Sequence, residues 1–571
     1  NTAALWHLDE SSGNATDSSA NANTGTMVNG TYSSGSLNNG LGFNGSTASL
    51  TAADSSSLSL TGDFTVEAWT KFNSSFSTTS NRNRQGVLDK GPYQMYYDNE
   101  SGKVVFEMAP SSANQWAQVA GPDMLNNNGV SINIETNKSW DANSKNFIWN
   151  QVVLGSDIYV ALGSITTGTT VTGDAEVWKC TACATAPVWS KIGGDGLNSS
   201  WADGLYEDAS SIVTDGTNIY TGIGNSSGEA EVWRYNGATW TKVGGDTVNS
   251  SWLIAAPGPY ERVTTMVADG TTIYAGLGTT ASDAEVWRCT NCDSSPTWAK
   301  IGGEGTGAGG QSWAANYEEV ASMIIVNGTT LAVGLGTSGG DAEVWTCATA
   351  SCTTTSGWTK RGGDASGTAG QSWTVAYDEV RSLASSGTVI YAGLGVTAAE
   401  AEVWRCDIGA TCTTTSGWTQ VGGDSIGSTP SWTAAGNYER VWSLVASGTT
   451  VYAGLGDSAG DAEVWMCTTC STAPAWTKLG GDGSGISGQS WGSVAGASFL
   501  YASSLSLIGT NLFVGASSSA GTSGAELWTC NTAATCNNTA GWTRVAGEYL
   551  NKSWGVFGLN GVQSMRTTGG K

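Results

Sequence analysis

Short runs of apolar residues, mostly β-branched or aromatic, alternate with Gly-, Asp- and Asn-rich turns along most of the chain. In one stretch, four such runs lie at Tyr260–Val267, Ile273–Gly278, Ala284–Cys289 and Trp298–Gly303. Runs of this kind, bounded by turn residues, are typical of β-strands. No stretch of useful length shows the apolar spacing of an amphipathic helix, so the sequence predicts an all-β protein.

The same four-strand unit recurs along the chain, and its most regular piece is Ala-Glu-Val-Trp in the third strand. Six identical copies and one Ala-Glu-Leu-Trp copy end at Trp178, Trp233, Trp287, Trp345, Trp404, Trp465 and Trp528. Seven complete four-stranded repeats are typical of a β-propeller, because packing the sheets around a ring covers both faces of each sheet. A linear β-solenoid is the competing architecture, although its repeats are usually shorter.

Two partial repeats flank the seven complete ones. Trp116–Gly121 resembles a fourth strand, and Leu559–Met565 resembles a first strand. A hybrid blade that used both would close a ring of eight, with Tyr93–Tyr97 and Lys103–Met108 as its middle strands. The alternatives are a ring of seven blades with extra strands, or a chain clipped within a repeat, and the sequence leaves the choice open.

The hairpin between the third and fourth strands resembles the Asp-box hairpin of sialidase-type propellers, in which a turn precedes a tryptophan that opens the last strand. Tyr235–Trp240 is the nearest match, and the Ser-x-Asp-x-Gly core is degraded in every copy. The resemblance implies the propeller architecture and does not extend to an activity.

Residues 1–111 follow a different pattern. Leu41–Gly45, Gly62–Trp69 and Gly102–Glu107 occur in an order that resembles the laminin-G-like, concanavalin-type jelly roll. That family implies a two-sheet sandwich that often binds glycans or Ca²⁺. We therefore expect a jelly-roll segment at 1–111, followed by the propeller at 112–571.

The jelly-roll segment is short for its family. Residues 112–136, another part of the chain or another subunit would have to complete it. An open strand edge is a template for strand addition. We therefore predict self-association into oligomers or filaments through this edge.

Twelve cysteines fall into six local pairs, each in the turn between the third and fourth strands. Zinc would need two Cys-x-x-Cys pairs close together, whereas the repeats place one pair in each blade. In the second repeat Asn236-Gly237, a strong hairpin signal, stands where the other repeats have cysteines, so a turn and a disulfide serve one purpose. The expected disulfides are Cys180–Cys183, Cys289–Cys292, Cys347–Cys352, Cys406–Cys412, Cys467–Cys470 and Cys530–Cys536.

Composition and charge bear on location and partners. The chain has 571 residues, only 13% of them charged, and a net charge of −24. An acidic surface repels phosphate backbones, which excludes nucleic acid. No run approaches the ~20 apolar residues of a transmembrane helix. Six disulfides indicate an oxidising compartment, and a chain that opens with Asn1 fits a removed signal peptide, so we expect a secreted or cell-surface protein.

Charged residues recur at two positions of the repeat, and we interpret them as cross-strand ion pairs worth ~0.2–1 kcal/mol each. The third strand carries Glu176, Glu231, Glu285, Glu343, Glu402, Glu463 and Glu526. The fourth strand carries Lys191, Lys242, Lys300, Lys360, Lys478 and Arg544, with Gln420 as the exception. Three tryptophans also recur in each repeat. Packing between blades is our interpretation of them, and stacking on sugar rings is the alternative.

Two further repeated features are candidate binding or modification sites. An acid follows the Gly-Gly that ends each of six blades, a pattern suited to Ca²⁺ or to capping of the local turn; no other pattern calls for a cofactor. The candidate calcium ligands are Asp195, Asp246, Glu304, Asp364, Asp424 and Asp482. The candidate glycosylation sites, which share one type of inter-blade loop, are Asn137, Asn198, Asn249 and Asn551.

No catalytic constellation is visible in the sequence. His7 is the single histidine, which excludes a Ser-His-Asp or Cys-His site elsewhere, and no repeat carries the unique acid pair of a glycosidase. We therefore predict a non-enzymatic, extracellular structural or adhesive protein that self-assembles into a filament or surface layer. A multivalent carbohydrate-binding lectin is the first alternative, and a polysaccharide-active propeller enzyme is the second.

Overall fold

The structure is a computed structural model. It describes residues 2–35, 38–44, 47–58, 65–71, 84–90, 93–98, 103–108, 147–163, 175–181, 188–202, 206–245, 248–252, 260–278, 284–303, 313, 317–337, 340, 342–363, 372–373, 377–395, 401–410, 412, 417–423, 432, 438–458, 462–470, 474–481, 499–518, 526–533, 536, 541–546 and 565. In these ranges the helices are short 3₁₀ turns, η1 (Ser56–Leu58), η2 (Leu197–Ser199), η3 (Val248–Ser250) and η4 (Thr355–Gly357). No helix in them has the length and apolar character needed to cross a membrane.

The N-terminal part contains three small antiparallel sheets: β1 pairs with β4, β2 pairs with β3, and β6 lies between β5 and β7. The bounds of these strands are β1 (Gly25–Val28), β2 (Thr31–Ser34), β3 (Asn39–Gly42), β4 (Ser49–Ala52), β5 (Arg84–Asp89), β6 (Tyr93–Asp98) and β7 (Lys103–Met108).

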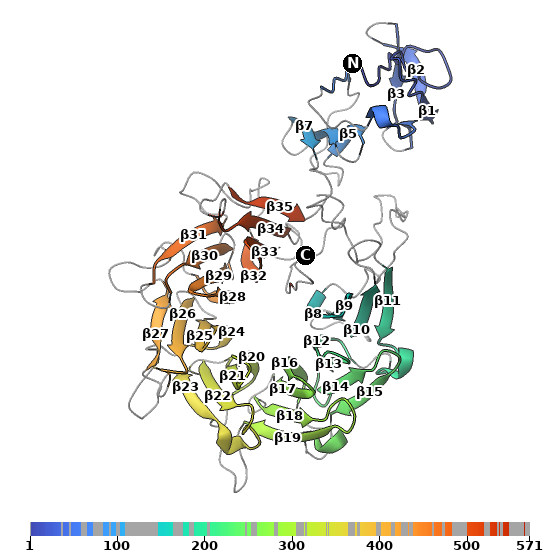
Figure 1. Cartoon of the computed structure of the whole chain (residues 1–571). Coiled ribbons are helices and arrows are strands. Elements are labelled where there is room, and N and C mark those ends of the chain that lie inside the picture. Colours follow the sequence, from blue (N-terminus) through green and yellow to red (C-terminus); the bar gives the residue numbers. More distant parts are fainter. Residues whose placement is uncertain are drawn as a thin grey trace.

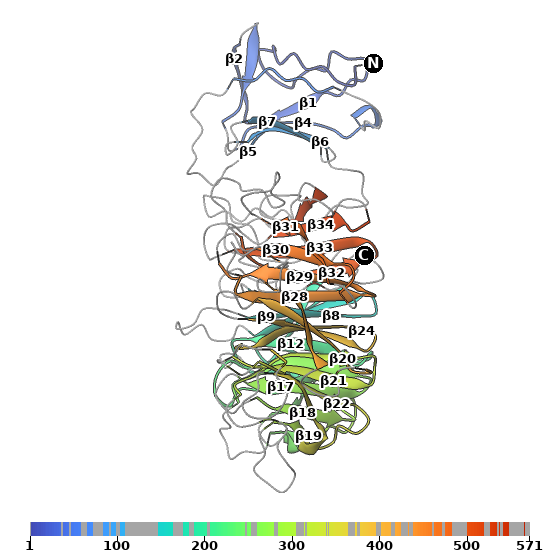
Figure 2. The same cartoon turned by 90° about the vertical axis from the view of Figure 1, so that its left-hand side faces the viewer.

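Two sequence-based expectations for this part meet the structure here. Residues 65–71, which overlap the Gly62–Trp69 motif of the jelly-roll resemblance, form no strand, and the laminin-G-like sandwich stays a prediction. The prediction that Tyr93–Tyr97 and Lys103–Met108 are middle strands of a closing blade is wrong. They lie in β6 and β7, which pair with each other and with β5 outside the ring (Figures 1 and 2). Trp116–Gly121 and residues 112–136 lie outside the described residues.

Seven four-stranded antiparallel meanders follow along the chain. Their bounds are β8 (Phe147–Leu154), β9 (Asp157–Gly163), β10 (Glu176–Thr181) and β11 (Val188–Gly193); β12 (Ala209–Thr214), β13 (Ile219–Ile223), β14 (Glu231–Tyr235) and β15 (Trp240–Gly244); β16 (Arg262–Asp269), β17 (Thr272–Gly278), β18 (Val286–Thr290) and β19 (Thr297–Gly302); β20 (Val320–Val326), β21 (Thr330–Leu335), β22 (Glu343–Ala348) and β23 (Thr359–Gly363); β24 (Val380–Ser386), β25 (Val389–Leu394), β26 (Glu402–Asp407) and β27 (Thr419–Gly422); β28 (Arg440–Ser447), β29 (Thr450–Gly456), β30 (Glu463–Cys467) and β31 (Trp476–Gly481); β32 (Phe499–Ile508), β33 (Asn511–Ser518), β34 (Glu526–Asn531) and β35 (Thr543–Ala546).

The meanders are arranged around a ring, with the first strand of each at the centre and the fourth at the periphery (Figure 1). The first strands contact one another in chain order from β8 through β12, β16, β20, β24 and β28 to β32. The last two meanders form one continuous sheet, because Gly456 of β29 pairs with Tyr501 of β32. This arrangement of antiparallel four-stranded sheets is a β-propeller.

A Ser–Gly–Val contact locks neighbouring blades together near the centre. A Cβ atom on Gly334 of β21 would lie 2.7 Å from Cβ of Val380 in the next blade, so only glycine allows this approach. Beside it, Oγ of Ser322 donates a hydrogen bond to the carbonyl oxygen of Val380 at 2.8 Å. The same close approach joins Gly222 to Val263, Gly276 to Val320 and Gly393 to Val441.

Three tryptophans pack together at five of the interfaces between blades in the described part of the chain. Trp373, in the loop after one blade, lies edge-on against Trp404 and Trp418 of the next blade, with ring centroids 5.9 and 5.5 Å away. Its Nε1 donates to the carbonyl oxygen of Ala342, and Nε1 of Trp418 donates to that of Arg361 in the preceding blade. Equivalent trios are Trp201/Trp233/Trp240, Trp252/Trp287/Trp298, Trp313/Trp345/Trp358 and Trp432/Trp465/Trp476.

Met565 bears on how the ring closes. It packs against Leu527 and Phe513 of the last meander. Met266 of β16 packs in the same way against the blade that precedes it. Residues 559–564 lie outside the described residues and Met565 itself is in no strand, so the further first strand at Leu559–Met565 and the number of blades in the closed ring stay predictions.

Candidate functional site

The repeated carboxylates hold each blade together. In the fourth blade, Oε2 of Glu343 accepts a hydrogen bond from Nε1 of Trp345 at 2.6 Å, and Oε1 pairs with Lys360 on the next strand. Five of the expected cross-strand ion pairs are therefore present, and their glutamates are buried, while the side chain of Arg544 lies outside the described residues. The other pairs are Lys191–Glu176, Lys242–Glu231, Lys300–Glu285 and Lys478–Glu463.

The tryptophan at the centre of four of the trios offers no surface for a sugar ring. Trp252, Trp313, Trp373 and Trp432 are completely buried, and their indole nitrogens donate to backbone carbonyl oxygens. Packing between blades, rather than stacking on sugars, is therefore the role of these side chains.

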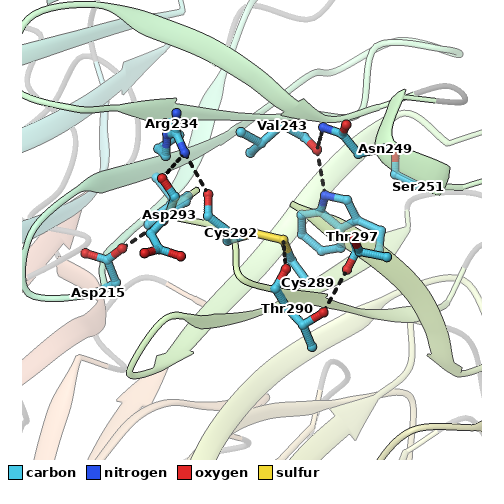
Figure 3. Close-up of a disulfide and its surroundings, with 12 residues drawn as sticks. Asp215, Arg234, Val243, Asn249, Ser251, Cys289, Thr290, Cys292, Asp293 and Thr297 are labelled. Carbon is cyan, nitrogen blue, oxygen red and sulfur yellow. Dashed lines mark hydrogen bonds between the residues drawn. A yellow bond between two sulfur atoms is a disulfide. The ribbon is translucent and has the colours of Figure 1, made fainter. Parts of the chain in front are cut away.

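The disulfides form contact points between blades. The structure joins Cys289–Cys292, Cys347–Cys352, Cys406–Cys412, Cys467–Cys470 and Cys530–Cys536. Cys180 is disulfide-bonded as well, and Cys183 lies outside the described residues. Figure 3 shows Nη1 of Arg234, from the preceding blade, donating to the carbonyl oxygens of Cys292, at 3.1 Å, and Asp293. Arg288 and Arg361 bind the carbonyl oxygens of Cys352 and Cys412 in the same way.

One of the six candidate calcium ligands can be placed. Asp195 pairs with Lys191, four residues earlier, and so already has a cationic partner. No group of three or more potential metal ligands occurs within the described ranges. Asp246, Glu304, Asp364, Asp424 and Asp482 lie outside them, and Ca²⁺ binding stays a prediction.

Two of the four candidate glycosylation sites are in described turns. Asn198 and Asn249 are exposed, yet each side-chain amide donates a hydrogen bond at 3.0 Å to a carbonyl oxygen of its fourth strand, that of Ile192 or Val243. Both residues adopt positive φ, which asparagine tolerates better than most residues. The Asn-Ser-Ser-Trp sequence therefore has a structural role in the turn. Asn137 and Asn551 lie outside the described residues.

Residues that break the repeat gather at one end of the central strands, where neighbouring first strands meet. This set, which we call the inner rim, is Asp208, Arg262, Glu319, Glu379, Arg440 and Tyr501. Each residue begins or immediately precedes a first strand or, for Tyr501, lies near its start. The backbone before them approaches the preceding blade closely: Gly336 has a φ of 134°, and a Cβ atom there would lie 2.1 Å from the carbonyl oxygen of Asp378. The glycine therefore brings successive rim residues close together.

One part of the inner rim is an Asp–Arg–Trp cluster. Asp208 accepts a hydrogen bond from Nε1 of Trp149 at 2.9 Å and pairs with Nη2 of Arg262 at 3.1 Å. The Arg262 guanidinium also lies over the Trp149 ring, 5.4 Å from its centroid, and bonds Asn225. Asp208 is buried, so the pair fixes the geometry of this side of the rim.

Glu319 of the inner rim has a strongly raised pKa. Burial first, and then the nearby negative charge of Glu379, raise its pKa to about 7 against the opposing effect of Arg381 and Arg262. A carboxyl group that changes charge near neutral pH can act as a proton donor or acceptor.

Sequence reasoning missed the inner rim, although a signal existed. In the segments Glu261-Arg262-Val263, Glu318-Glu319-Val320 and Glu439-Arg440-Val441, the flanking residues repeat while the central one changes between Arg and Glu. A residue that changes between repeats while its two neighbours stay the same indicates a position whose side chain is not determined by packing.

Comparisons with known proteins concern the fold. No protein-family model and no curated protein matches the chain. Among solved structures, a putative 6-phosphogluconolactonase from Bacteroides fragilis is 12% identical, with a TM-score of 0.37, and the match covers 68% of this chain and 94% of that one. The β-propeller domain of the Trilobed protease from Pyrococcus furiosus is 8% identical, with a TM-score of 0.34, over 70% of this chain and 98% of that one. A puromycin-hydrolyzing peptidase from Mycobacterium tuberculosis is 11% identical, with a TM-score of 0.41, over 76% and 57%.

Proposed function

We propose that the protein is an extracellular, non-enzymatic structural or adhesive surface protein whose copies associate through the N-terminal part. The observation that carries this proposal is the distribution of exposed apolar side chains. Four of the six large ones among the described residues fall between residues 5 and 69: Leu5, Val28, Phe43 and Trp69, of which Trp69 is 92% exposed. Exposed apolar groups gathered in one region are typical of association surfaces.

The propeller supports this role because it is a strongly stabilised domain. Five described disulfides and the buried ion pairs strengthen its blades, and disulfides of this density indicate an oxidising compartment. The repeated tryptophans and glutamates are engaged in packing, so the N-terminal part and the inner rim are left to carry function.

Sedimentation velocity over a concentration series tests the proposal. We expect the intact, oxidised protein to form oligomers, and Trp69→Ser together with Phe43→Ser to shift it towards monomer. Leu197→Ser is the matched control, because Leu197 is an exposed apolar residue on the propeller (40% exposed). A protein that is monomeric at all concentrations, or a control that dissociates it equally, would overturn the proposal.

The second candidate function is a polysaccharide-active enzyme at the inner rim, favoured by one observation. Glu319 and Glu379 lie close enough to interact, and the pKa of Glu319 is raised to about 7, while glycoside hydrolysis needs two carboxyl groups, one of them a general acid with a raised pKa. Release of reducing ends from a polysaccharide, abolished by Glu319→Gln, would establish this function. Equal release by the variant would exclude the pair.

A further inference from the structure

A second cluster lies across β24, β28 and β32, where Glu379, Arg440 and Tyr501 of the inner rim meet two further residues, Arg381 and Trp442. It is built on an aromatic platform. Trp442 of β28 stacks on Tyr501 with ring centroids 4.3 Å apart and an angle of 16° between the planes. Nε1 of Trp442 donates to the carbonyl oxygen of Gly456 at 3.1 Å, which fixes the indole. Two guanidinium groups lie over this same indole, with Cζ of Arg440 at 4.6 Å and Cζ of Arg381 at 4.8 Å from its centroid.

Glu379 keeps these two cations close together. Its Oε1 lies 3.7 Å from Nε of Arg381 and 3.7 Å from Nε of Arg440, too far for a hydrogen bond to either. The side chain is only 5% exposed, and Oε1 has no hydrogen-bond partner. Glu379 therefore faces the Nε edges of both guanidinium groups and leaves their terminal nitrogens to other partners.

The terminal nitrogens have few partners in the described part of the chain. A guanidinium carries five N–H donors, and Arg381 makes no hydrogen bond there, although its side chain is one-third exposed. Arg440 donates one hydrogen bond, from Nε to the carbonyl oxygen of Gly395 at 3.2 Å, and its Nη2 is 3.7 Å from Asp457. Two neighbouring guanidinium groups whose terminal N–H donors have few partners match the geometry of a carboxylate.

The surroundings limit the ligand to a small one with few charges. An acid precedes the rim residue in five successive blades, forming a belt of Glu207, Glu261, Glu318, Asp378 and Glu439. Together with the net charge of −24, this belt repels a polyanion over a Debye length of ~8–10 Å. A single carboxylate that pairs with both arginines meets a much smaller barrier.

We propose that Arg381 and Arg440 bind the carboxylate group of a small organic acid at the inner rim, above the Trp442 ring. The shared chemistry is one carboxylate beside hydroxyl groups, which both sugar acids and simple hydroxy acids possess. This site is separate from the N-terminal association surface and does not depend on self-association.

Isothermal titration calorimetry on the full-length, oxidised protein tests the proposal with sodium D-glucuronate, sodium L-lactate and D-glucose as probes. We expect glucuronate to bind and glucose not to bind. If lactate binds with the same affinity as glucuronate, the carboxylate alone is recognised. If lactate binds more weakly, the sugar ring of glucuronate also contributes to binding. Arg381→Gln should weaken binding by about tenfold or more, because it removes charge-assisted hydrogen bonds.

Arg405→Gln on β26 is the matched control, since it removes the same charge at a strand-three position outside the inner rim. Its affinity should stay within about twofold of the unmodified protein, as expected for a distant site. Arg381→Lys keeps the positive charge but lacks the planar set of N–H donors of a guanidinium, so this variant should bind with intermediate affinity. Absence of binding by both carboxylates, equal binding of glucose, or an equal loss in Arg405→Gln would overturn the proposal. Circular dichroism checks that each variant is folded.

Discussion

The blade interfaces and the inner rim are made by the same strands, but they differ in whether their residues repeat from blade to blade. At the interfaces the same side chains return in blade after blade, as with Trp373 between Trp404 and Trp418, and the indole nitrogen of Trp373 donates to a carbonyl oxygen within the protein. At the inner rim the residue changes from blade to blade, and Oε1 of Glu379 and Nε of Arg262 are buried without hydrogen bonds. Native proteins keep few such groups. We infer that the interface positions maintain the fold, whereas the rim positions are free to serve another function.

Trp373→Ala should have the largest effect on the interface side of this comparison. The side chain is completely buried, and its loss removes two ring contacts and the hydrogen bond to Ala342. We expect a loss of about 3–5 kcal/mol in the free energy of unfolding, as for other large buried aromatic residues. Urea denaturation followed by circular dichroism measures it.

Leu197→Ala is the control for this variant, because Leu197 is an exposed apolar residue on the propeller. It should change the unfolding free energy by less than about 0.5 kcal/mol. A small effect of Trp373→Ala would show that neighbouring blades can collapse into the space, and that the trios matter less than their burial indicates.

The sequence predicted the part of the fold that repetition makes visible. The seven Ala-Glu-Val-Trp-type copies located the third strands, and the paired cysteines located the disulfides, because each motif returns in register. The partners of the indole nitrogens could not be read in this way, since Trp418 donates to Arg361 of another blade and this contact depends on how the blades pack. The second cluster of the inner rim joins residues about 60 positions apart on neighbouring strands, which no local pattern reveals.

The N-terminal part shows the limit of a resemblance that rests on a few short motifs. Gly62–Trp69, one of the motifs that carry the resemblance, has apolar residues at alternate positions, a pattern typical of a strand. Residues 65–71 instead form none, and Trp69 is exposed. Strand formation depends on a neighbouring strand that supplies hydrogen bonds and packing, and a short segment without a repeat gives no evidence of that neighbour.

Glu319→Gln tests the inner rim with an effect that depends on pH. The pKa of Glu319 is about 7 in the folded protein, whereas a free glutamate side chain has a pKa near 4.5. Between these values the folded state keeps a proton that the unfolded state has lost, so this group lowers the stability as the pH rises from about 4.5 to 7. We expect the variant to be more stable than the parent by on the order of 1–3 kcal/mol at pH 8, and equal to it at pH 4.

Unfolding curves of both proteins at a series of pH values measure this difference. A gap that grows between pH 4.5 and 7 and then levels off would support the assignment to Glu319. A gap of constant size across the series would contradict it, because a lost contact without proton linkage acts equally at every pH.

Gln420→Lys should have the smallest effect. It tests the repeated positions, since Gln420 marks the one repeat without a basic residue at this place in the fourth strand. In the fifth blade Gln420 stands where Lys360 and Lys478 pair with their glutamates, and its Nε2 is buried without a hydrogen-bond partner. A lysine there would bring its ammonium group to Glu402 and remove an unsatisfied donor, so we expect a gain of about 1 kcal/mol in unfolding free energy. The reciprocal variant Lys360→Gln should lose a similar amount in the fourth blade. If Gln420→Lys and Lys360→Gln both destabilised the protein, the fifth blade would pack differently from the fourth around this position. Position 420 would then vary between blades as the inner-rim residues do, and would not follow the repeat.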